Sequence, residues 1–487
     1  FFFKQKTAYE IYQCDWSSDV CSSDLLRDLY PTPEAWDAAY AQARQQADAL
    51  PALKERAGSG AAALRDTLVT ISDLQRELAR LWVYANLSGD EDLRVARGQE
   101  RKQQVMALWS SVEEKNAWIA PAVLQWGPEK VRGWIAADPV LKARFDFYLE
   151  DILRNAAHTL TPEGEGLLAA AGAVLSQPNT VFEQLVESEL PRPTVALSKG
   201  KPVKLDISAY ELYRQSRVRA DRKRVFDAFF GSLKSVEGTL GANLNTQVQG
   251  AVFSARARKF GSALEAALWS ANMPPAVYRQ LVEQAHAGLP VLHRYLKLRQ
   301  KMLGIRGGLA YYDNYPPLAE PPKSMRFDIA RSQAITLAAL QPLGDEYLGL
   351  LKKGFAAQWI DSHPRPSKAS GGYMSGAAYD VHPYLLLNHN DDFQSLSTYA
   401  HEWGHAVHTM LAKSAQPFDK ADYATFIAES ASIGNEMLLS DYVIANAKTP
   451  EEKLFYLTQA LESIRTDRKS TRLNSSHTDI SRMPSSA

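Results

Sequence analysis

The sequence predicts a mainly helical protein built from two lobes, with a small β-sheet beside one of its last helices. Apolar residues recur three and four positions apart between residues 64 and 81, which gives that segment one apolar face. A similar period runs through segments 97–118, 129–156, 207–235, 274–303 and 328–353. A chain of 487 residues is long for one compact domain and suits two lobes with separate cores.

Two irregular stretches interrupt the predicted helices. Residues 191–206 indicate a short hairpin around 198–201, and we expect a boundary there between an amino-terminal helical lobe, 26–190, and a carboxy-terminal catalytic domain, 191–466. The Gly-, Pro- and Ser-rich residues 359–382 indicate a loop. The short apolar run that follows, 383–388, is compatible with a strand or a buried helical turn, and its length and flanking residues favour a strand.

Charge and composition exclude several classes of partner and site. Lys+Arg and Asp+Glu number 55 each, so no overall field favours nucleic acid or an anionic membrane. No apolar run approaches the ~20 residues that a membrane span requires, and we therefore expect a soluble protein. Both cysteines lie within the first 25 residues, so the body of the chain has neither a disulfide framework nor a thiolate metal site. A metal in this body must be held by His and carboxylate groups.

The two ends of the chain lack any helical or strand period. Residues 1–25 and 467–487 resemble translated sequencing-adapter text, and a pair of natural tails is the alternative. We expect both ends to be non-native additions, which are set aside in reasoning about the fold. We expect a cytoplasmic location. A periplasmic or secreted location stays open, because non-native ends would mean that the natural amino terminus is not known.

Segment 394–413 predicts a helix that carries His401, Glu402 and His405. Residues four apart lie one turn apart on the same helix face, so the two imidazoles can bind one Zn²⁺. Glu402 follows the first His and can reach a metal-bound water without being a ligand, which is where a general base belongs. A surface helix with incidental histidines is the alternative, but the mostly apolar neighbours of the motif predict a buried helix.

A catalytic zinc needs three protein ligands and one open position. A third His six residues after the second is excluded, because Leu411 occupies that position. His408 can reach this region, although a histidine packed in the core or at its rim is the simpler interpretation. The remaining candidate is Glu429 on the next helix, where an unpaired carboxylate among apolar residues would be costly to bury. Its alternative is a carboxylate favoured by the helix dipole. Glu436 lies two turns further on the same face and can orient a ligand imidazole.

These motifs resemble those of the thimet oligopeptidase and oligoendopeptidase F metallopeptidases. The resemblance rests on HEWGHAVHTM (401–410), FIAESASIGNE (426–436) and GYMSGAAYDVHPYLLLN (372–388), and it covers the helical body more weakly. It implies a zincin-like, mainly helical fold whose two lobes enclose a deep substrate channel. It also implies one Zn²⁺ per chain with His401, His405 and Glu429 as ligands. Glu402 would be the catalytic base.

The resemblance further implies a function and a substrate strand. The function is zinc-dependent endopeptidase cleavage of short, unstructured peptides. The strand beside which the substrate backbone lies is formed by Tyr384, Leu385, Leu386, Leu387 and Asn388, and we expect its free edge to supply hydrogen bonds.

The resemblance ends near Thr466. The family continues with a loop whose His and Tyr residues hold the scissile carbonyl and its oxyanion, and this chain does not supply them. Two rival functions stay open. One is a related zinc carboxypeptidase or dipeptidase, and the other is a helical protein that retains zinc and binds peptides without turnover.

Overall fold

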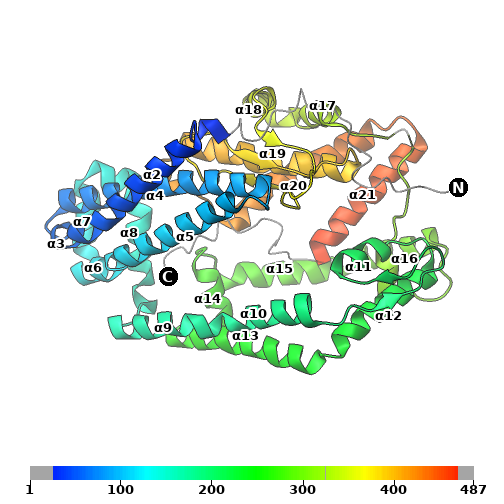
Figure 1. The fold of residues 1–487 in the computed structure, drawn as a ribbon, viewed down its shortest axis with the longest axis horizontal. Coiled ribbons are helices and arrows are strands. Elements are labelled where there is room, and N and C mark those ends of the chain that lie inside the picture. The colour runs from blue at the N-terminus through cyan, green and yellow to red at the C-terminus, as the bar shows by residue number, and fades with distance from the viewer. Residues whose placement is uncertain (1–25, 324, 470–487) are drawn as a thin grey trace. The chain divides into compact units, whose positions relative to one another are not determined.

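The computed structural model describes residues 26–323 and 325–469 and is mainly helical, which confirms the predicted fold class. Figure 1 shows its elements with the labels used below. The described part divides into two compact units: the first contains residues 26–150 and 325–442, and the second contains residues 151–323 and 443–469. No helix in these ranges is both long enough and apolar enough to cross a membrane.

The two units divide the chain differently from the consecutive lobes, 26–190 and 191–466, that the sequence predicts. Each unit is assembled from two separate stretches, and the hairpin near residue 198 lies inside the second unit. A hairpin marks a change of local structure, whereas a compact unit depends on which distant elements pack together. Of the two expected tails, residues 1–25 and 470–487 lie outside the described residues, and residues 467–469 end helix α21.

The first unit contains most of the long helices and the sheet. Its helices are α2 (Pro33–Ala49), α3 (Lys54–Ala57), α4 (Ala61–Glu91), α5 (Ala96–Asn116), α6 (Ile119–Trp126), α7 (Pro128–Ala137), α8 (Asp146–Arg154), α17 (Ile329–Ala339), α18 (Gly344–Ala356), α19 (Phe393–Ala415) and α20 (Thr425–Ala445), of which α8 and α20 run on into the second unit. Its short helical turns are η1 (Leu26–Asp28), η2 (Leu50–Leu53), η3 (Leu141–Phe145), η7 (Gln341–Leu343) and η8 (Phe418–Lys420).

The predicted apolar face of α4 is confirmed. All six residues that define it are buried: Leu64, Leu68, Ile71, Leu74, Leu78 and Leu81. Helix α5 lies alongside α4 (Figure 1), and α2 packs on both. This helical layer supports one face of the sheet, because the side chain of Tyr373 on the sheet donates a hydrogen bond to Asp90 of α4 at 2.7 Å.

The sheet of the first unit has three short strands in the order β3–β5–β4. They are β3 (Ile360–Asp361), β5 (Tyr384–Leu386) and β4 (Tyr373–Ser375). Strand β5 pairs in parallel with β3 and antiparallel with β4, so it is the central strand. Its presence confirms the predicted strand after the Gly- and Pro-rich loop.

Helix α19 covers the other face of the sheet. Its fully buried Trp403 and Tyr399 pack in one hydrophobic cluster with Leu385 and Leu387, which lie at and just after β5, and with Trp359. Helices α17 and α18 also pack on α19. The predicted buried helix is therefore confirmed, and its rotation about its own axis is set by these large apolar side chains.

The second unit is helical apart from one hairpin. Its helices are α9 (Pro162–Leu175), α10 (Gln177–Glu183), α11 (Ile207–Tyr213), α12 (Arg219–Lys234), α13 (Glu237–Ala257), α14 (Ala263–Trp269), α15 (Pro275–Ala287), α16 (Leu289–Met302) and α21 (Pro450–Lys469), with short turns η4 (Asn155–His158), η5 (Gln184–Glu189) and η6 (Tyr311–Asn314). Strands β1 (Thr194–Val195) and β2 (Val203–Lys204) form the predicted antiparallel hairpin. Gly200 in its turn has φ +92°, a conformation that favours glycine.

Four of the predicted helical segments are each divided into two helices. Segment 328–353 breaks between α17 and α18, where Pro342 is followed by Gly344 at φ +86°. Segment 274–303 breaks at Gly288, two residues before a proline. The apolar spacing alone does not reveal these two breaks, which are marked instead by the Gly and Pro residues at the junctions.

Candidate metal centre

Helix α19 presents His401 and His405 on one face. The helix begins at Asp392, whose carboxylate accepts a hydrogen bond from the backbone N–H of Ser395 at 2.8 Å and so caps the first turn. The two imidazole rings stand one turn apart, with ring centroids 4.9 Å apart and planes at 83°. Both side chains are largely buried.

Helix α20 brings a carboxylate to the same place. The chain leaves α19, passes through η8 and returns along α20 (Figure 1). Oε2 of Glu429 lies 3.4 Å from Nε2 of His401 and 3.6 Å from Nε2 of His405. The structure thus brings together His401, His405 and Glu429, whose candidate ligand atoms all lie within 4.8 Å of one another.

These distances suit a tetrahedral zinc ion. Bonds of about 2.0–2.2 Å at tetrahedral angles place neighbouring ligand atoms about 3.3–3.6 Å apart. The two measured separations between the carboxylate oxygen and the imidazole nitrogens, 3.4 and 3.6 Å, fall in that range. Two imidazoles and one carboxylate are also a donor set that zinc accepts when one position is left for water or substrate. The residues present therefore fit the ion.

Glu436 lies behind His401 on the side away from Glu429. Its Oε1 is 3.4 Å from Nδ1 of His401 and accepts a hydrogen bond from Ser397 at 3.3 Å. Burial opposes a charge on His401, but the hydrogen bond with Glu436 and the charges of Glu402, Glu436 and Glu429 outweigh burial and raise its pKa. A carboxylate on Nδ1 fixes the tautomer that leaves Nε2 as the ligand atom.

Glu402 is 2% exposed and stands in the turn between the two histidines. A carboxylate so deeply buried is costly unless a cation or proton donor accompanies it. Its negative charge acts on His401, where it favours the protonated ring. The arrangement therefore provides a proton acceptor beside the cluster in addition to the three candidate ligands.

His408 packs against Tyr423 rather than joining the cluster. The two rings are stacked with centroids 3.9 Å apart and planes at 19°. Burial lowers the pKa of His408, which favours the neutral imidazole. The Tyr423 hydroxyl shares a 2.7 Å hydrogen bond with Thr409, so this pair ties α19 to the segment that leads into α20.

The expected substrate strand has no free edge, and that expectation is wrong. Tyr384, Leu385 and Leu386 form β5, whose two edges are occupied by β3 and β4. The N–H of Leu387 also bonds to Asp361, and Asn388 uses its side chain to hold the loop before β4. A run of apolar residues that faces helices on both sides is typical of a central strand.

Strands β3 and β4 are the two outer strands of the sheet, and β4 is the one that packs on α19. In the antiparallel pairing, Met374 stands opposite Leu385, whose N–H points to β3 and donates to the carbonyl oxygen of Trp359 at 2.9 Å. The backbone N–H and C=O of Met374 therefore point away from β5, toward the outer edge of the sheet.

The sequence reasoning missed a lysine that holds this sheet. The Lys368 side chain is 0% exposed, and its ammonium group contacts the Asp361 carboxylate at 2.9 Å and the carbonyl oxygens of His363 and Leu387 at 2.8 and 2.5 Å. It thereby ties the loop before β4 to the ends of β3 and β5. A lone lysine in a Gly- and Ser-rich loop gives no local sign of burial, so no sequence signal identified it.

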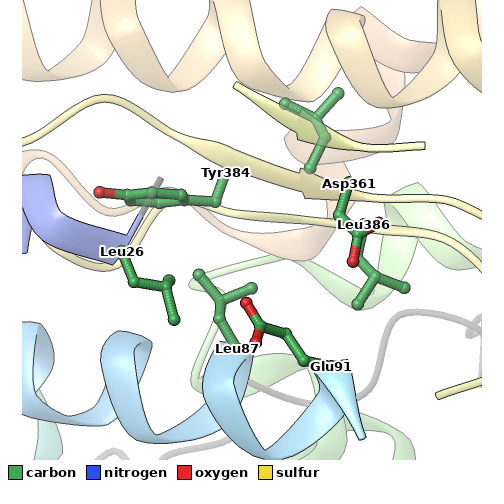
Figure 2. A pocket seen from close by; sticks show the side chains of 7 residues that line it. Leu26, Leu87, Glu91, Asp361, Tyr384 and Leu386 are labelled. Atoms are coloured by element: carbon green, nitrogen blue, oxygen red, sulfur yellow. The ribbon is translucent and has the colours of Figure 1, made fainter. Parts of the chain in front are cut away.

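A small cavity lies where α4 meets β3 and β5, on the face of the sheet opposite α19 (Figure 2). Its volume is about 20 Å³, which admits about one water molecule and no peptide. It is lined by Leu26, Leu87, Glu91, Asp361, Tyr384, Leu385 and Leu386. The cavity therefore does not serve as the substrate site.

Two models of known protein families together match most of the chain. The family model described as peptidase family M3 matches residues 212–477, and the model described as oligopeptidase F matches residues 123–191. The gap between the two matches contains the hairpin β1–β2.

Individual relatives agree with these matches. Oligopeptidase PepF of Bacillus subtilis is 30% identical over 450 residues, which cover 92% of this chain and 67% of the relative. An oligoendopeptidase F homologue of Lactococcus lactis is 31% identical over 444 residues, which cover 90% of this chain and 72% of the relative.

Solved structures share the fold. The crystal structure of oligoendopeptidase-F from Enterococcus faecium has a TM-score of 0.63 at 25% identity and covers 89% of this chain and 71% of that one. The crystal structure of a Chlamydophila abortus protein has a TM-score of 0.80 at 31% identity and covers 91% of this chain and 73% of that one.

Proposed function

The chain belongs to peptidase family M3 and is a peptidase, and from this premise we propose that it is a zinc-dependent endopeptidase of short, unstructured peptides. His401, His405 and Glu429 would hold one zinc ion per chain. The observation that carries the proposal is the convergence of the Glu429 carboxylate on both imidazoles at 3.4 and 3.6 Å, because this spacing is that of ligands on one tetrahedral ion. The family is one of metallopeptidases, generally zinc-dependent, which supports the choice of metal.

Glu402 would be the general base. Zinc, when bound, supplies polarisation of the scissile carbonyl and lowers the pKa of a bound water toward ~7. The carboxylate of Glu402 would accept a proton from the attacking water and donate it to the nitrogen of the leaving amine. Its burial supports this role, because a carboxylate enclosed beside the cluster can hold a proton out of contact with bulk water.

We propose the outer edge of β4, rather than β5, as the place where substrate backbone pairs. The N–H and C=O of Met374 face away from β5, and an extended peptide can add to such an edge as a further strand. This strand also packs directly on α19, so a peptide on its edge would run beside the metal-binding helix.

Turnover of an internally quenched peptide tests the proposal. The zinc-loaded protein should cleave it, lose activity with a chelator and recover with added zinc. Glu402→Gln should retain one zinc per chain and lose about 10²–10⁴-fold in rate, because the shape of the side chain survives while the base does not. Glu346→Gln, an exposed position on α18, is the matched control and should leave the rate unchanged.

Three outcomes distinguish the alternatives. Mass spectrometry of products from a longer peptide separates internal cleavage from release of single residues or dipeptides at an end, which would indicate the carboxypeptidase or dipeptidase reading. Zinc binding without cleavage would indicate a peptide-binding protein. A Glu402→Gln rate within a few-fold of the original would show that another group is the base.

A further inference from the structure

Helices α19 and α20 lie in close contact at Gly404. A Cβ atom built on this glycine would lie 2.7 Å from Cα of Ser432, 2.9 Å from the carbonyl oxygen of Ala431 and 3.0 Å from the backbone N of Ser432. All three atoms belong to the backbone of α20, so no change of side-chain rotamer can relieve the contact. The crossing distance of the two helices therefore depends on the missing side chain at position 404.

This crossing lies at the metal ligands themselves. Gly404 directly precedes His405 and is three residues after His401, while Ser432 is one helical turn after Glu429. The separation of the two helix axes at this point therefore sets the separation between the carboxylate and the two imidazoles. A second contact fixes the register, because Asn435 of α20 donates a hydrogen bond to the Ala400 carbonyl of α19 at 2.9 Å.

Ser432 also holds the carboxylate directly. Its side chain is 0% exposed, and its hydroxyl donates to Oε2 of Glu429 at 2.8 Å, with the Glu429 carbonyl oxygen 3.1 Å away. Oε2 is the same oxygen that lies 3.4 and 3.6 Å from the histidine nitrogens. The hydroxyl thus selects one carboxylate oxygen and aims it between the two rings.

We propose that Gly404 and Ser432 are a pair of positioning residues for the third metal ligand. Gly404 lets α20 come close enough, and the Ser432 hydroxyl orients the Glu429 carboxylate once it is there. This inference rests on the proposed zinc site and adds how the chain builds it.

The contact distances give the size of the effect. Moving the Ser432 Cα from 2.7 Å to an ordinary contact of 3.4 Å requires a shift of about 0.7 Å between the helices. Metal–ligand bonds tolerate about 0.2 Å, so Gly404→Ala displaces Glu429 by more than one ion can absorb without rearrangement. Loss of an outer hydrogen bond to a ligand typically weakens metal affinity about 10–100-fold, which is the effect expected for Ser432→Ala.

The experiment measures the zinc dissociation constant by competition with a chromophoric chelator, and the thermal midpoint of the metal-free protein alongside it. The variants are Ser432→Ala, Gly404→Ala and the control Gly434→Ala, which lies on α20 with nothing within 4 Å of the added Cβ. We expect both test variants to bind zinc at least about tenfold more weakly, while the control binds as the unmodified protein does.

The metal-free midpoint separates positioning from a general structural role. Ser432→Ala should weaken zinc binding while its metal-free midpoint stays within the range of the Gly434→Ala control. If Ser432→Ala binds zinc within about twofold of the unmodified protein, the inference is overturned. This result is decisive even if Gly404→Ala fails to fold. If the unmodified protein itself binds no zinc, or if His405→Ala binds it equally well, the proposed function falls and the positioning role falls with it.

Discussion

Replacement of Lys368 by methionine tests whether a buried ammonium group holds the sheet beside the candidate metal centre. Burial lowers the pKa of Lys368 from 10.5 to about 8, although the nearby Asp361 opposes this shift. For Asp361, burial would raise the pKa, but the hydrogen bond from Arg365 and the charge of Lys368 outweigh it and hold the pKa below its usual value. The pair is therefore charged at neutral pH, and burial opposes the charge on both groups.

The lowered pKa of Lys368 predicts that the free energy of unfolding rises with pH. Below pH 8 the lysine is protonated in both folded and unfolded chains, and the full cost of burying it is present. Between about pH 8 and 10.5 the unfolded chain binds more protons than the folded one, so the contribution of Lys368 to the free energy of unfolding rises with pH. A shift of this size corresponds to about 3 kcal/mol across that window.

Urea unfolding of the original protein and Lys368→Met, followed by circular dichroism from pH 7 to 10.5, measures this contribution. At pH 7 the variant should be less stable by about 3–5 kcal/mol, because the Asp361 carboxylate and three carbonyl oxygens lose their buried donor. The gap between the two proteins should then widen by about 3 kcal/mol toward pH 10.5. Lys352→Met on the exposed side of α18 is the matched control. Parallel stability profiles for the original protein and Lys368→Met would refute the reasoning.

Further predictions concern the metal and the packing around it. His405→Ala should reduce bound zinc from one ion per chain to near zero by elemental analysis, and full retention would exclude His405 as a ligand. Tyr373→Phe should cost about 1–3 kcal/mol in urea unfolding, because Asp90 loses a 2.7 Å hydrogen bond in a buried site; an unchanged midpoint would contradict this. Gly354→Ala should cost about 1–3 kcal/mol, because its Cβ would enter the buried indole ring of α19, whereas Gly349→Ala has open space and should not destabilise.

The helices and the histidine pair follow from the sequence because their geometry is local. Spacings of three and four residues on one helix place side chains on one face whatever the rest of the chain does. This is why the buried face of α4 and the pairing of His401 with His405 could be read directly. The chemical type of the proposed third ligand could also be narrowed, since a carboxylate expected among apolar residues, such as Glu429, needs a partner.

The order of the strands could not be read in the same way. An apolar run such as 383–388 predicts a strand, but its neighbours in the sheet come from residues about 10 to 25 positions earlier in the chain. The consecutive leucines of that run are typical of a strand covered on both faces, as β5 is, and do not indicate the free edge that we expected.

The chain's local pattern by itself determined the helical class, the hairpin, the helix with the His401–His405 pair and the chemical type of the proposed ligands. Only the tertiary structure decided that β5 is the central strand, that Lys368 is buried among carbonyl oxygens, and that Gly404 meets the backbone of Ser432. The physical reason is one of range. Helical periodicity acts within one or two turns, whereas strand order and the close approach of two helices depend on distant segments whose packing no local spacing encodes.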